Sequence, residues 1–134
     1  LGDGEIQEGQ VWEAAMFASA KGLDNLVAVV DNNGLQIDGK ISEVNSPYPI
    51  AEKFKSFGWN VIEICAHSFD EIDAAFNAAA EFKGKPSVIV ANSVKGKGVS
   101  FMEDQVSWHG TAPNAEQYEQ AMSELTQALA ELEA

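Results

Sequence analysis

Two short stretches of the sequence combine glycine with oxygen-bearing side chains. Gly2-Asp3-Gly4 holds a carboxylate between two glycines, and the stretch 31–34 (Asp-Asn-Asn-Gly) contributes the amide oxygen of Asn33. Such oxygens, together with a backbone carbonyl near Leu35 and the phosphates of a ligand, are the donors that Mg²⁺ prefers. Gly4 also lets the backbone approach a phosphate closely. Either stretch alone is most simply a turn, but together they favour a site for a cation and a phosphorylated ligand.

The segments around these stretches alternate between predicted strands and helices. Apolar runs predict strands at 26–31, 60–65 and 86–92, and the first has the composition of a strand buried on both faces. Periodicity and capping residues predict helices at 10–21, 50–58, 69–82 and from 115 onward. The alternation predicts an α/β fold, with a parallel sheet and helices on both faces. Ligands bind such sheets at the carboxyl ends of the strands, where we expect Asp3 and Asn33 to meet.

The chain opens on the glycine turn, so we interpret Leu1 as the last residue of a strand. This interpretation predicts a fragment, in which residues 1–134 form a single partial domain with its N-terminal part absent. The missing strand would leave apolar side chains uncovered, and Trp12, Met16 and Phe17 are the candidates. Self-association through such a surface is then expected.

The composition narrows the range of partners. A net charge of −13 argues against nucleic acid and against anionic membranes, because clustered lysine and arginine bind both. A phosphorylated ligand would therefore need a divalent cation to offset the repulsion. The single cysteine, Cys65, lies in an apolar run and is expected to be a buried side chain of a cytoplasmic protein. A calcium loop at 31–39 is rejected, because Leu35 and Gln36 stand where an oxygen donor and a glycine are needed.

The two stretches also carry a resemblance to a known family. The segment from GDGEIQEGQ to VVDNN is similar to the thiamine-diphosphate motif, which begins with GDG and closes with an asparagine. The short motifs GDGE, QEG, EA and DNL, and later SWHG, resemble those of transketolase in particular. This resemblance spans nearly the whole chain. It implies the thiamine-diphosphate-binding fold of a transketolase N-terminal domain, or of the N-terminal subunit of a split transketolase.

The resemblance implies roles for individual residues in holding the cofactor. Asp3 and Asn33 would ligate Mg²⁺ (or Ca²⁺) through their side chains, and Leu35 through its carbonyl. The diphosphate of thiamine diphosphate would lie against the remaining cofactor-binding residues, which are Gly4, Glu5, Lys95 and His109. Two glycines beside Lys95 support close approach of the backbone to a ligand, although a loop lysine is usually only solvated.

Two residues would take part in catalysis according to the resemblance. His109 would lie near the diphosphate and a substrate oxygen, and Glu8 would connect two active sites across a dimer interface. On the residues alone, His109 belongs to a long loop of the kind that often carries function. Glu8 could equally be an acid that the dipole of the following helix favours.

The resemblance implies transfer of a two-carbon ketol unit from a ketose phosphate to an aldose phosphate, as in the pentose phosphate pathway. The partners would be sugar phosphates, a pyrimidine-binding transketolase domain or C-terminal subunit, and a second copy in a homo-oligomer. Because the pyrimidine-binding part supplies an activating glutamate in the family, we expect the isolated chain to be inactive. The alternatives are a deoxyxylulose-phosphate synthase, a keto-acid dehydrogenase component, or a non-catalytic remnant.

Overall fold

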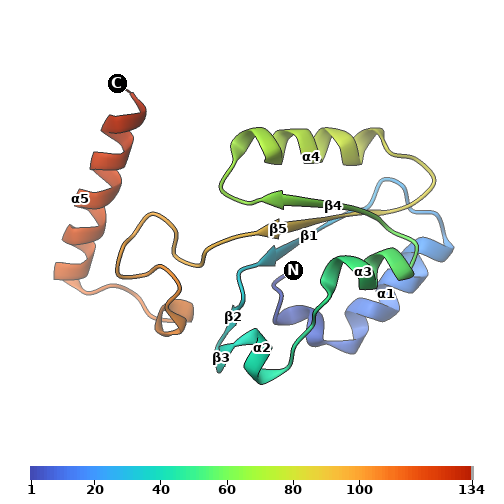
Figure 1. Cartoon of the computed structure of the whole chain (residues 1–134), viewed down its shortest axis with the longest axis horizontal. Helices are drawn as coiled ribbons and strands as arrows, with labels where there is room; N and C mark the ends of the chain where they lie inside the picture. Colours follow the sequence, from blue (N-terminus) through green and yellow to red (C-terminus); the bar gives the residue numbers. More distant parts are fainter. Residues whose placement is uncertain (134) are drawn as a thin grey trace.

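A parallel three-stranded sheet forms the centre of the molecule (Figure 1). The computed structural model describes residues 1–133, and its strands β1 (Val27–Asn32), β5 (Ser87–Asn92) and β4 (Asn60–Cys65) lie in the order β1-β5-β4. Val27 of β1 and Asn60 of β4 both face Ser87 in register, and both pairings are parallel. The sequence therefore predicted both the strands and their direction correctly.

The first residues of the chain extend this sheet on the open side of β1. Gly2 forms a parallel bridge with Asp31, the amide of Asp31 donates to the carbonyl of Leu1 at 2.8 Å, and the amide of Asp3 donates to the carbonyl of Asp31 at 3.1 Å. The interpretation of Leu1 as the end of a strand stays a prediction, whereas Asp3 leaves the sheet at the same edge as Asn33, as expected.

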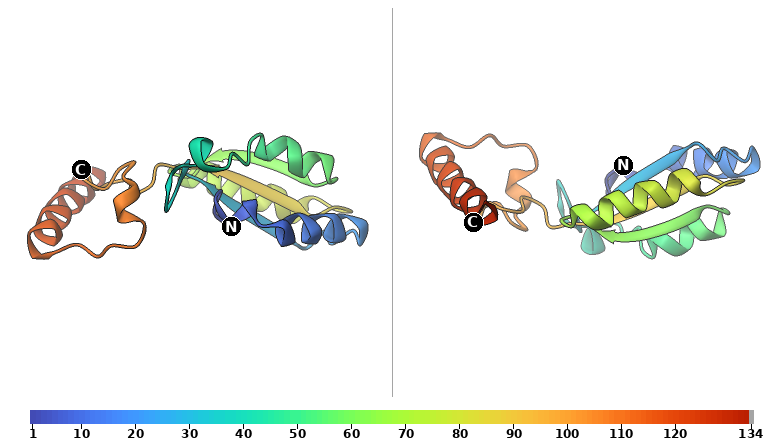
Figure 2. Two further views of the ribbon diagram at one scale, coloured as in Figure 1. Left: turned by 90° about the horizontal axis from the view of Figure 1, so that it is seen from below. Right: turned by 90° about the horizontal axis from the view of Figure 1, so that it is seen from above.

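Helices cover both faces of the sheet, as the alternating pattern predicted. Helices α1 (Gly9–Ala20) and α3 (Ile50–Ser56) lie on one face, and α4 (Phe69–Glu81) lies on the other (Figure 2). The first face holds the larger core, which includes Ile6, Val30, Phe54, Trp59 and Val88. The second face has a smaller core around Ile64, Ala75 and Ile89.

The burial of the strands differs from the expectation in two places. The strand predicted to be buried on both faces is β1, but only Val30 of its six residues is buried, whereas Ser87–Ala91 of β5 are all buried. The reason is the strand order, which puts β5 in the centre and β1 on the outside. Cys65 is also exposed rather than buried, because it is the last residue of the other outer strand, β4.

Several short elements had no clear signal in the sequence. The loop after β1 forms a small antiparallel hairpin, β2 (Leu35–Gln36) with β3 (Gly39–Lys40), followed by the one-turn helix α2 (Ile41–Val44). Two short 3-10 helices, η1 (Glu5–Gln7) and η2 (Val106–His109), lie in the segments that follow the glycine turn and precede the last helix. Each of these elements has too few residues to show a period.

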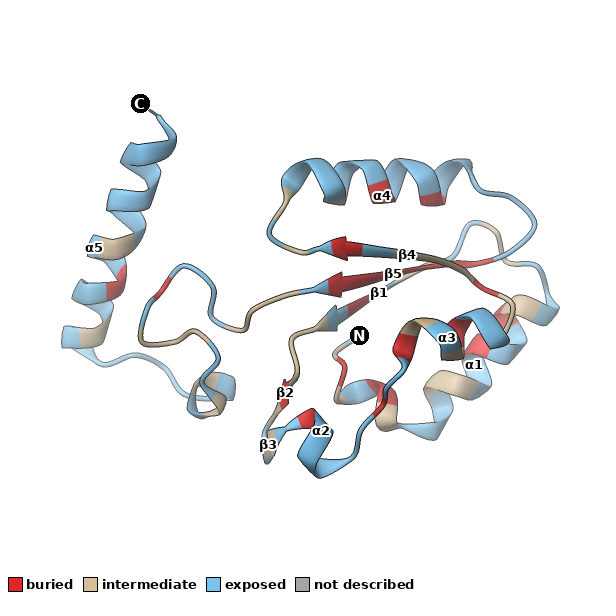
Figure 3. Ribbon diagram, in the orientation of Figure 1, coloured by how far each residue is buried: buried red, intermediate tan, exposed pale blue. Residues whose placement is uncertain are grey.

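The last helix, α5 (Ala115–Leu132), stands apart from the sheet and its covering helices (Figure 1). Its start is well defined, because Asn114 and Gln117 form a capping box in which each side chain accepts from the other residue's backbone amide, both at 2.9 Å. Figure 3 shows that burial is concentrated in the sheet and its helices, while α5 is almost wholly exposed. No helix in residues 1–133 is long and apolar enough to cross a membrane.

The three apolar residues of α1 that were expected to be uncovered behave differently from one another. Met16 and Phe17 are indeed exposed. Trp12 is instead half-buried, with its ring 5.1 Å from the ring of Phe54 and its indole N–H donating to the carbonyl of Ile6 at 2.8 Å. Trp12 therefore belongs to the packing between α1 and α3, and the prediction that it lies uncovered is wrong.

Candidate cofactor site

A cavity of about 450 Å³ opens at the carboxyl edge of the sheet. It is lined by residues from three separate parts of the chain, namely the opening turn, the β1–β3 segment and the long connection after β5. The lining residues are Gly2, Asp3, Gly4, Glu5, Asp31, Asn33, Leu35, Gln36, Ile37, Asp38, Lys95 and His109. Seven of the eight residues that the sequence assigned to the site are therefore brought together, and Glu8 is the exception.

Asp3 is the most deeply placed acid of the cavity, with only 1% of its surface exposed. Its carboxylate accepts the backbone amide of Gly4 at 2.9 Å and that of Gly34 at 2.6 Å. Burial raises the pKa of Asp3 above its ordinary value, although these two amides oppose the effect. Within residues 1–133 no lysine, arginine or histidine forms an ion pair with it. A buried carboxylate without a counter-charge fits a site whose cation comes from outside the protein.

Asn33 is held beside Asp3 by the end of the neighbouring strands. Its amide nitrogen donates to Asp31 at 3.0 Å, and its amide oxygen accepts the backbone amide of Leu35 at 3.0 Å. The hydroxyl of Ser93, which follows β5, donates to the other oxygen of Asp31. Asp31 therefore links the ends of β1 and β5 and fixes which way the Asn33 amide faces.

The hairpin carrying Leu35 is fastened to the opening turn by two glutamines. The side-chain nitrogen of Gln7 donates to the side-chain oxygen of Gln36 at 2.6 Å and to the carbonyl of Asn45 at 2.7 Å. A Cβ placed on Gly4 would lie 3.2 Å from the Cβ of Gln36, so a larger residue there would require Gln36 to move by a few tenths of an ångström. The backbone of the turn thus stays open to the cavity, as close approach of a phosphate requires.

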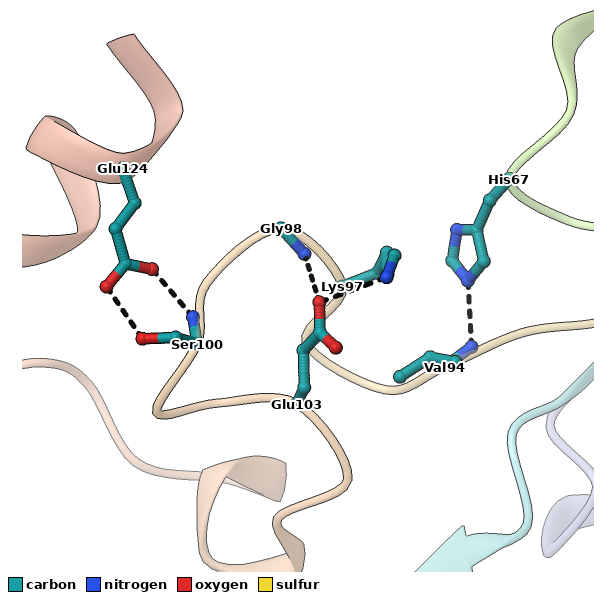
Figure 4. A network of polar contacts seen from close by, with 7 residues as sticks. All are labelled: His67, Val94, Lys97, Gly98, Ser100, Glu103 and Glu124. Atoms are coloured by element: carbon teal, nitrogen blue, oxygen red, sulfur yellow. Dashed lines mark hydrogen bonds and ion pairs between the residues drawn. The ribbon is translucent and has the colours of Figure 1, made fainter. Parts of the chain in front are cut away.

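Lys95 reaches the cavity from a tightly folded loop. The amide of Asp104 donates to the carbonyl of Lys95 at 3.0 Å and closes the loop at its base. Lys97 instead pairs with Glu103 at 3.3 Å, and Figure 4 shows that Glu103 also accepts the amide of Gly98. Lys95 forms no ion pair within the described chain, which leaves its charge available to an anion in the cavity.

His109 ends the short helix η2, which lies against β2 and so brings the side chain to the mouth of the cavity. The neighbouring Trp108 supports this helix, with its indole N–H donating to the carbonyl of Phe101 at 3.0 Å and its ring 5.3 Å from that of Phe101. His109 itself is exposed.

Glu8 lies outside the cavity, as the N-terminal cap residue of α1, and its exposed side chain makes no capping hydrogen bond. This position is compatible with the helix-dipole interpretation and with a role at an interface. The catalytic role that the resemblance implied for Glu8 stays a prediction.

Three contributors to the site had no clear signal in the sequence. From the sequence, Asp31 is only the end of a strand. In the structure it accepts hydrogen bonds from both Ser93 and Asn33, which is possible because β1 and β5 are neighbours. Gln7 and Gln36 meet across 29 residues of chain, because the hairpin folds back onto the opening turn. The Gln-Glu-Gly-Gln run around Gln7 was the one sequence feature that could have drawn attention to this contact.

The fold and the site define a class of protein. A parallel α/β sheet carries, at the carboxyl ends of its strands, a buried acid, an amide, a glycine turn and a lysine, a set of groups that could hold a cation together with a diphosphate. A family model described as "Transketolase, thiamine diphosphate binding domain" matches residues 1–130. The chain belongs to this transketolase family of thiamine-diphosphate-binding domains.

Individual relatives agree with this assignment. The chain is 46% identical over 125 residues to the 6-deoxy-6-sulfo-D-fructose transketolase subunit SqwG of Clostridium sp. (strain MSTE9), covering 93% of this chain and 46% of the relative. It is 41% identical over 133 residues to one of the apulose-4-phosphate transketolase subunits of Phocaeicola vulgatus, covering 99% of this chain and 47% of the relative. The chain thus spans about half the length of these curated relatives.

Solved structures agree as well. The transketolase of Campylobacter jejuni superposes with a TM-score of 0.87 at 29% identity, covering 93% of this chain and 20% of that one. The expected thiamine-diphosphate-binding fold is therefore confirmed. The alternatives from other thiamine-diphosphate enzymes are not favoured, because both the family model and these relatives are transketolases.

Proposed function

We propose that this chain is the part of a transketolase that binds the diphosphate of thiamine diphosphate through Mg²⁺. The complete enzyme would transfer a two-carbon ketol unit from a ketose phosphate to an aldose phosphate. The single observation that carries the proposal is the buried Asp3, whose carboxylate lacks a counter-charge within the described residues and faces the same cavity as Asn33 and Lys95.

Each residue of the cavity has a distinct task in this proposal. Asp3 and Asn33 hold the cation through their side chains, and Leu35 does so through its carbonyl. Gly4 and Glu5 lie against the diphosphate, and Lys95 neutralises part of its charge. The surface of the protein is strongly acidic, with a net charge of −13, so the cation and Lys95 are needed to make an anionic cofactor bind at all.

The cofactor, if held there, would supply the carbon nucleophile that the two-carbon transfer requires. Around it, His109 would hold a substrate oxygen at the mouth of the cavity, and Glu8 would connect to a second active site across an interface. The proposed substrate class is a sugar phosphate, as in the name of the apulose-4-phosphate relative. The other relative is named for 6-deoxy-6-sulfo-D-fructose, which carries a sulfonate instead of a phosphate. Since the curated relatives are named as subunits, we expect a pyrimidine-binding partner to complete the site, and the isolated chain to be inactive.

A thermal-shift titration tests the binding step of this proposal. Thiamine diphosphate with Mg²⁺ is expected to raise the melting temperature, since a ligand bound only by the folded state stabilises it by about 2.7 kcal/mol at one hundred times its Kd. Asp3→Ala and Asn33→Ala should each abolish the Mg²⁺-dependent rise. Asp38→Ala is the matched control, because it removes an exposed carboxylate from the same cavity and should keep the rise.

The outcome separates the possible explanations. An equal rise in the wild type, Asp3→Ala and Asp38→Ala would show that the cation site is not at Asp3. If the isolated chain shows no rise, the same titration is made after adding the pyrimidine-binding subunit. A further absence of response would contradict cofactor binding by this chain.

A further inference from the structure

The last helix carries an apolar stripe that the rest of residues 1–133 leaves largely uncovered. Five large apolar residues of α5 recur at alternating intervals of four and three residues, which places them on one side of the helix. They are Tyr118, Met122, Leu125, Leu129 and Leu132, and each is more than 40% exposed. The stripe covers roughly 21 Å along the helix at 1.5 Å per residue. Exposed apolar surface of this length and regularity is typical of a helix that packs against another surface.

A separate set of contacts holds α5 to its own chain. The carboxylate of Glu124 accepts the backbone amide and the hydroxyl of Ser100, both at 2.7 Å, as Figure 4 shows. On the same helix Ala121 is buried, and the side chain of Leu125 lies next to Gly98 of the loop. These contacts orient the helix but leave the C-terminal part of the stripe, at Leu129 and Leu132, exposed to solvent.

The charges of α5 indicate what could cover the stripe. The helix holds four glutamates (Glu116, Glu119, Glu124 and Glu131) and neither lysine nor arginine. None of the four forms an ion pair within residues 1–133, and Glu116 and Glu119 have no hydrogen-bonded side-chain partner there either. A second copy of α5 would bring acid against acid, and the net charge of −13 would add to that repulsion. Anionic membranes are disfavoured for the same reason.

We propose that the stripe of α5 docks into an apolar groove, rimmed by lysine or arginine, on the complementary pyrimidine-binding subunit. This inference rests on the proposed function, which calls for such a subunit, and on the naming of the relatives as transketolase subunits. The apolar side chains supply the affinity, and Glu116 and Glu119 supply long-range attraction to the basic rim. In this arrangement α5 is a docking element, and it is separate from the cofactor cavity.

The test uses the full protein and its complementary subunit, with the affinity measured by biolayer interferometry. The double variant Met122→Gln with Leu129→Gln removes two residues of the stripe that lie one heptad apart. The double variant Ser123→Gln with Ala130→Gln makes the same change, at the same spacing, on exposed residues one position further along the helix. We expect the first to bind at least about tenfold more weakly, and the second within about twofold of the wild type. Rising salt should also weaken the wild-type complex.

Each other outcome contradicts the proposal in a distinguishable way. Equal affinity of both double variants, or no binding by the wild type, would exclude the groove on that subunit. If the wild type forms a homodimer that Met122→Gln with Leu129→Gln dissociates, the occupant is a second copy. If that variant melts earlier without any change in affinity, another part of the same chain covers the stripe. The thermal shift with thiamine diphosphate and Mg²⁺ reports the proposed function separately, because the stripe lies outside the cavity.

Discussion

The sheet with its covering helices, residues 1–92, and the C-terminal segment, residues 93–133, are held in place by different forces. The first region has two apolar cores, and Ile6, Phe54 and Val88 in them are at most 1% exposed. The second region buries only Val99 and Ala121 among its described residues, and depends on polar contacts such as Glu124 with Ser100. The first region is therefore a rigid frame, while the second can rearrange at a smaller cost in free energy.

The cofactor site joins these two regions. Asp3, Asn33 and Leu35 come from the frame, and Lys95 and His109 come from the C-terminal segment. The proposed cation ligands are thus preformed, whereas the residues that would meet the diphosphate and the substrate depend on weaker contacts. This division suits the proposed site, which would hold a cation firmly and still admit and release other ligands.

The largest effect is expected in the frame. Phe54→Ala should lower the free energy of unfolding by about 3–5 kcal/mol, because it leaves a cavity between α3, Trp12 and Trp59. Phe69→Ala is the matched control, since Phe69 is 88% exposed, and it should change stability by less than about 0.5 kcal/mol. Urea unfolding followed by circular dichroism measures both. Similar losses for the two variants would contradict the picture of a packed frame.

A smaller effect is expected from the loop that carries Lys95. Gly96 has φ of 73°, and a Cβ there would lie 2.5 Å from the carbonyl oxygen of Met102, so Gly96→Ala must open the loop. We expect thiamine diphosphate to bind about tenfold more weakly, a change of roughly 1.4 kcal/mol, with the melting temperature of the frame altered by less than about 2 °C. Calorimetric titration in the presence of the partner subunit measures the affinity.

Gly98→Ala provides the comparison for this loop. Gly98 also has a positive φ, 97°. A Cβ added there would have the side chain of Leu125 as its nearest neighbour, at 3.5 Å. Because the backbone strain is shared and the clash is absent, Gly98→Ala should weaken the cofactor less than Gly96→Ala. The reverse order would show that loop closure at Met102 does not position Lys95.

A still smaller effect is expected where α5 meets the loop. Ser100→Ala removes one of the two hydrogen bonds to Glu124 and keeps the backbone one. Amide hydrogen exchange at residues 98–104 and 115–125 should become faster, while exchange in β5 stays unchanged. Ser107→Ala changes an exposed serine of the same segment whose side chain forms no hydrogen bond within residues 1–133, and it should leave both rates as in the wild type. Faster exchange in β5 would show that the two regions unfold together.

The two regions are also expected to respond to pH in opposite directions. Hydrogen bonds from Ser100 lower the pKa of Glu124 below its ordinary 4.5, so their contribution to stability is present above pH 4.5 and is lost as pH falls through the lowered pKa. Burial raises the pKa of Asp3 above its ordinary 3.8, so the chain without metal loses stability as pH rises from 3.8 through the raised pKa. Titration of the two carboxyl groups by NMR should give a pKa below 4.5 for Glu124 and above 3.8 for Asp3, and a shift of either pKa in the opposite direction would contradict this expectation.

Much of the fold and of the site was predictable because the signals are local. Apolar runs indicated the strands. The expected helix starts near residues 69 and 115 agree with the structure, where the caps Ser68 and Asn114 each accept a backbone amide from three positions further along the chain. Asp3 and Asn33 could be placed at one edge because every strand of a parallel sheet ends on the same side.

The features that the sequence did not reveal depend on which segments become neighbours. By itself the sequence determined the α/β pattern, the capped helices and the placement of Asp3 and Asn33 at the same edge of the sheet, since each follows from contacts short in sequence or from the direction of the strands. Only the tertiary structure decided that β5 rather than β1 is central, that Cys65 is exposed, and that Gln7 meets Gln36. These outcomes depend on the lateral order of strands and the return path of loops, which are set by the packing of the whole chain.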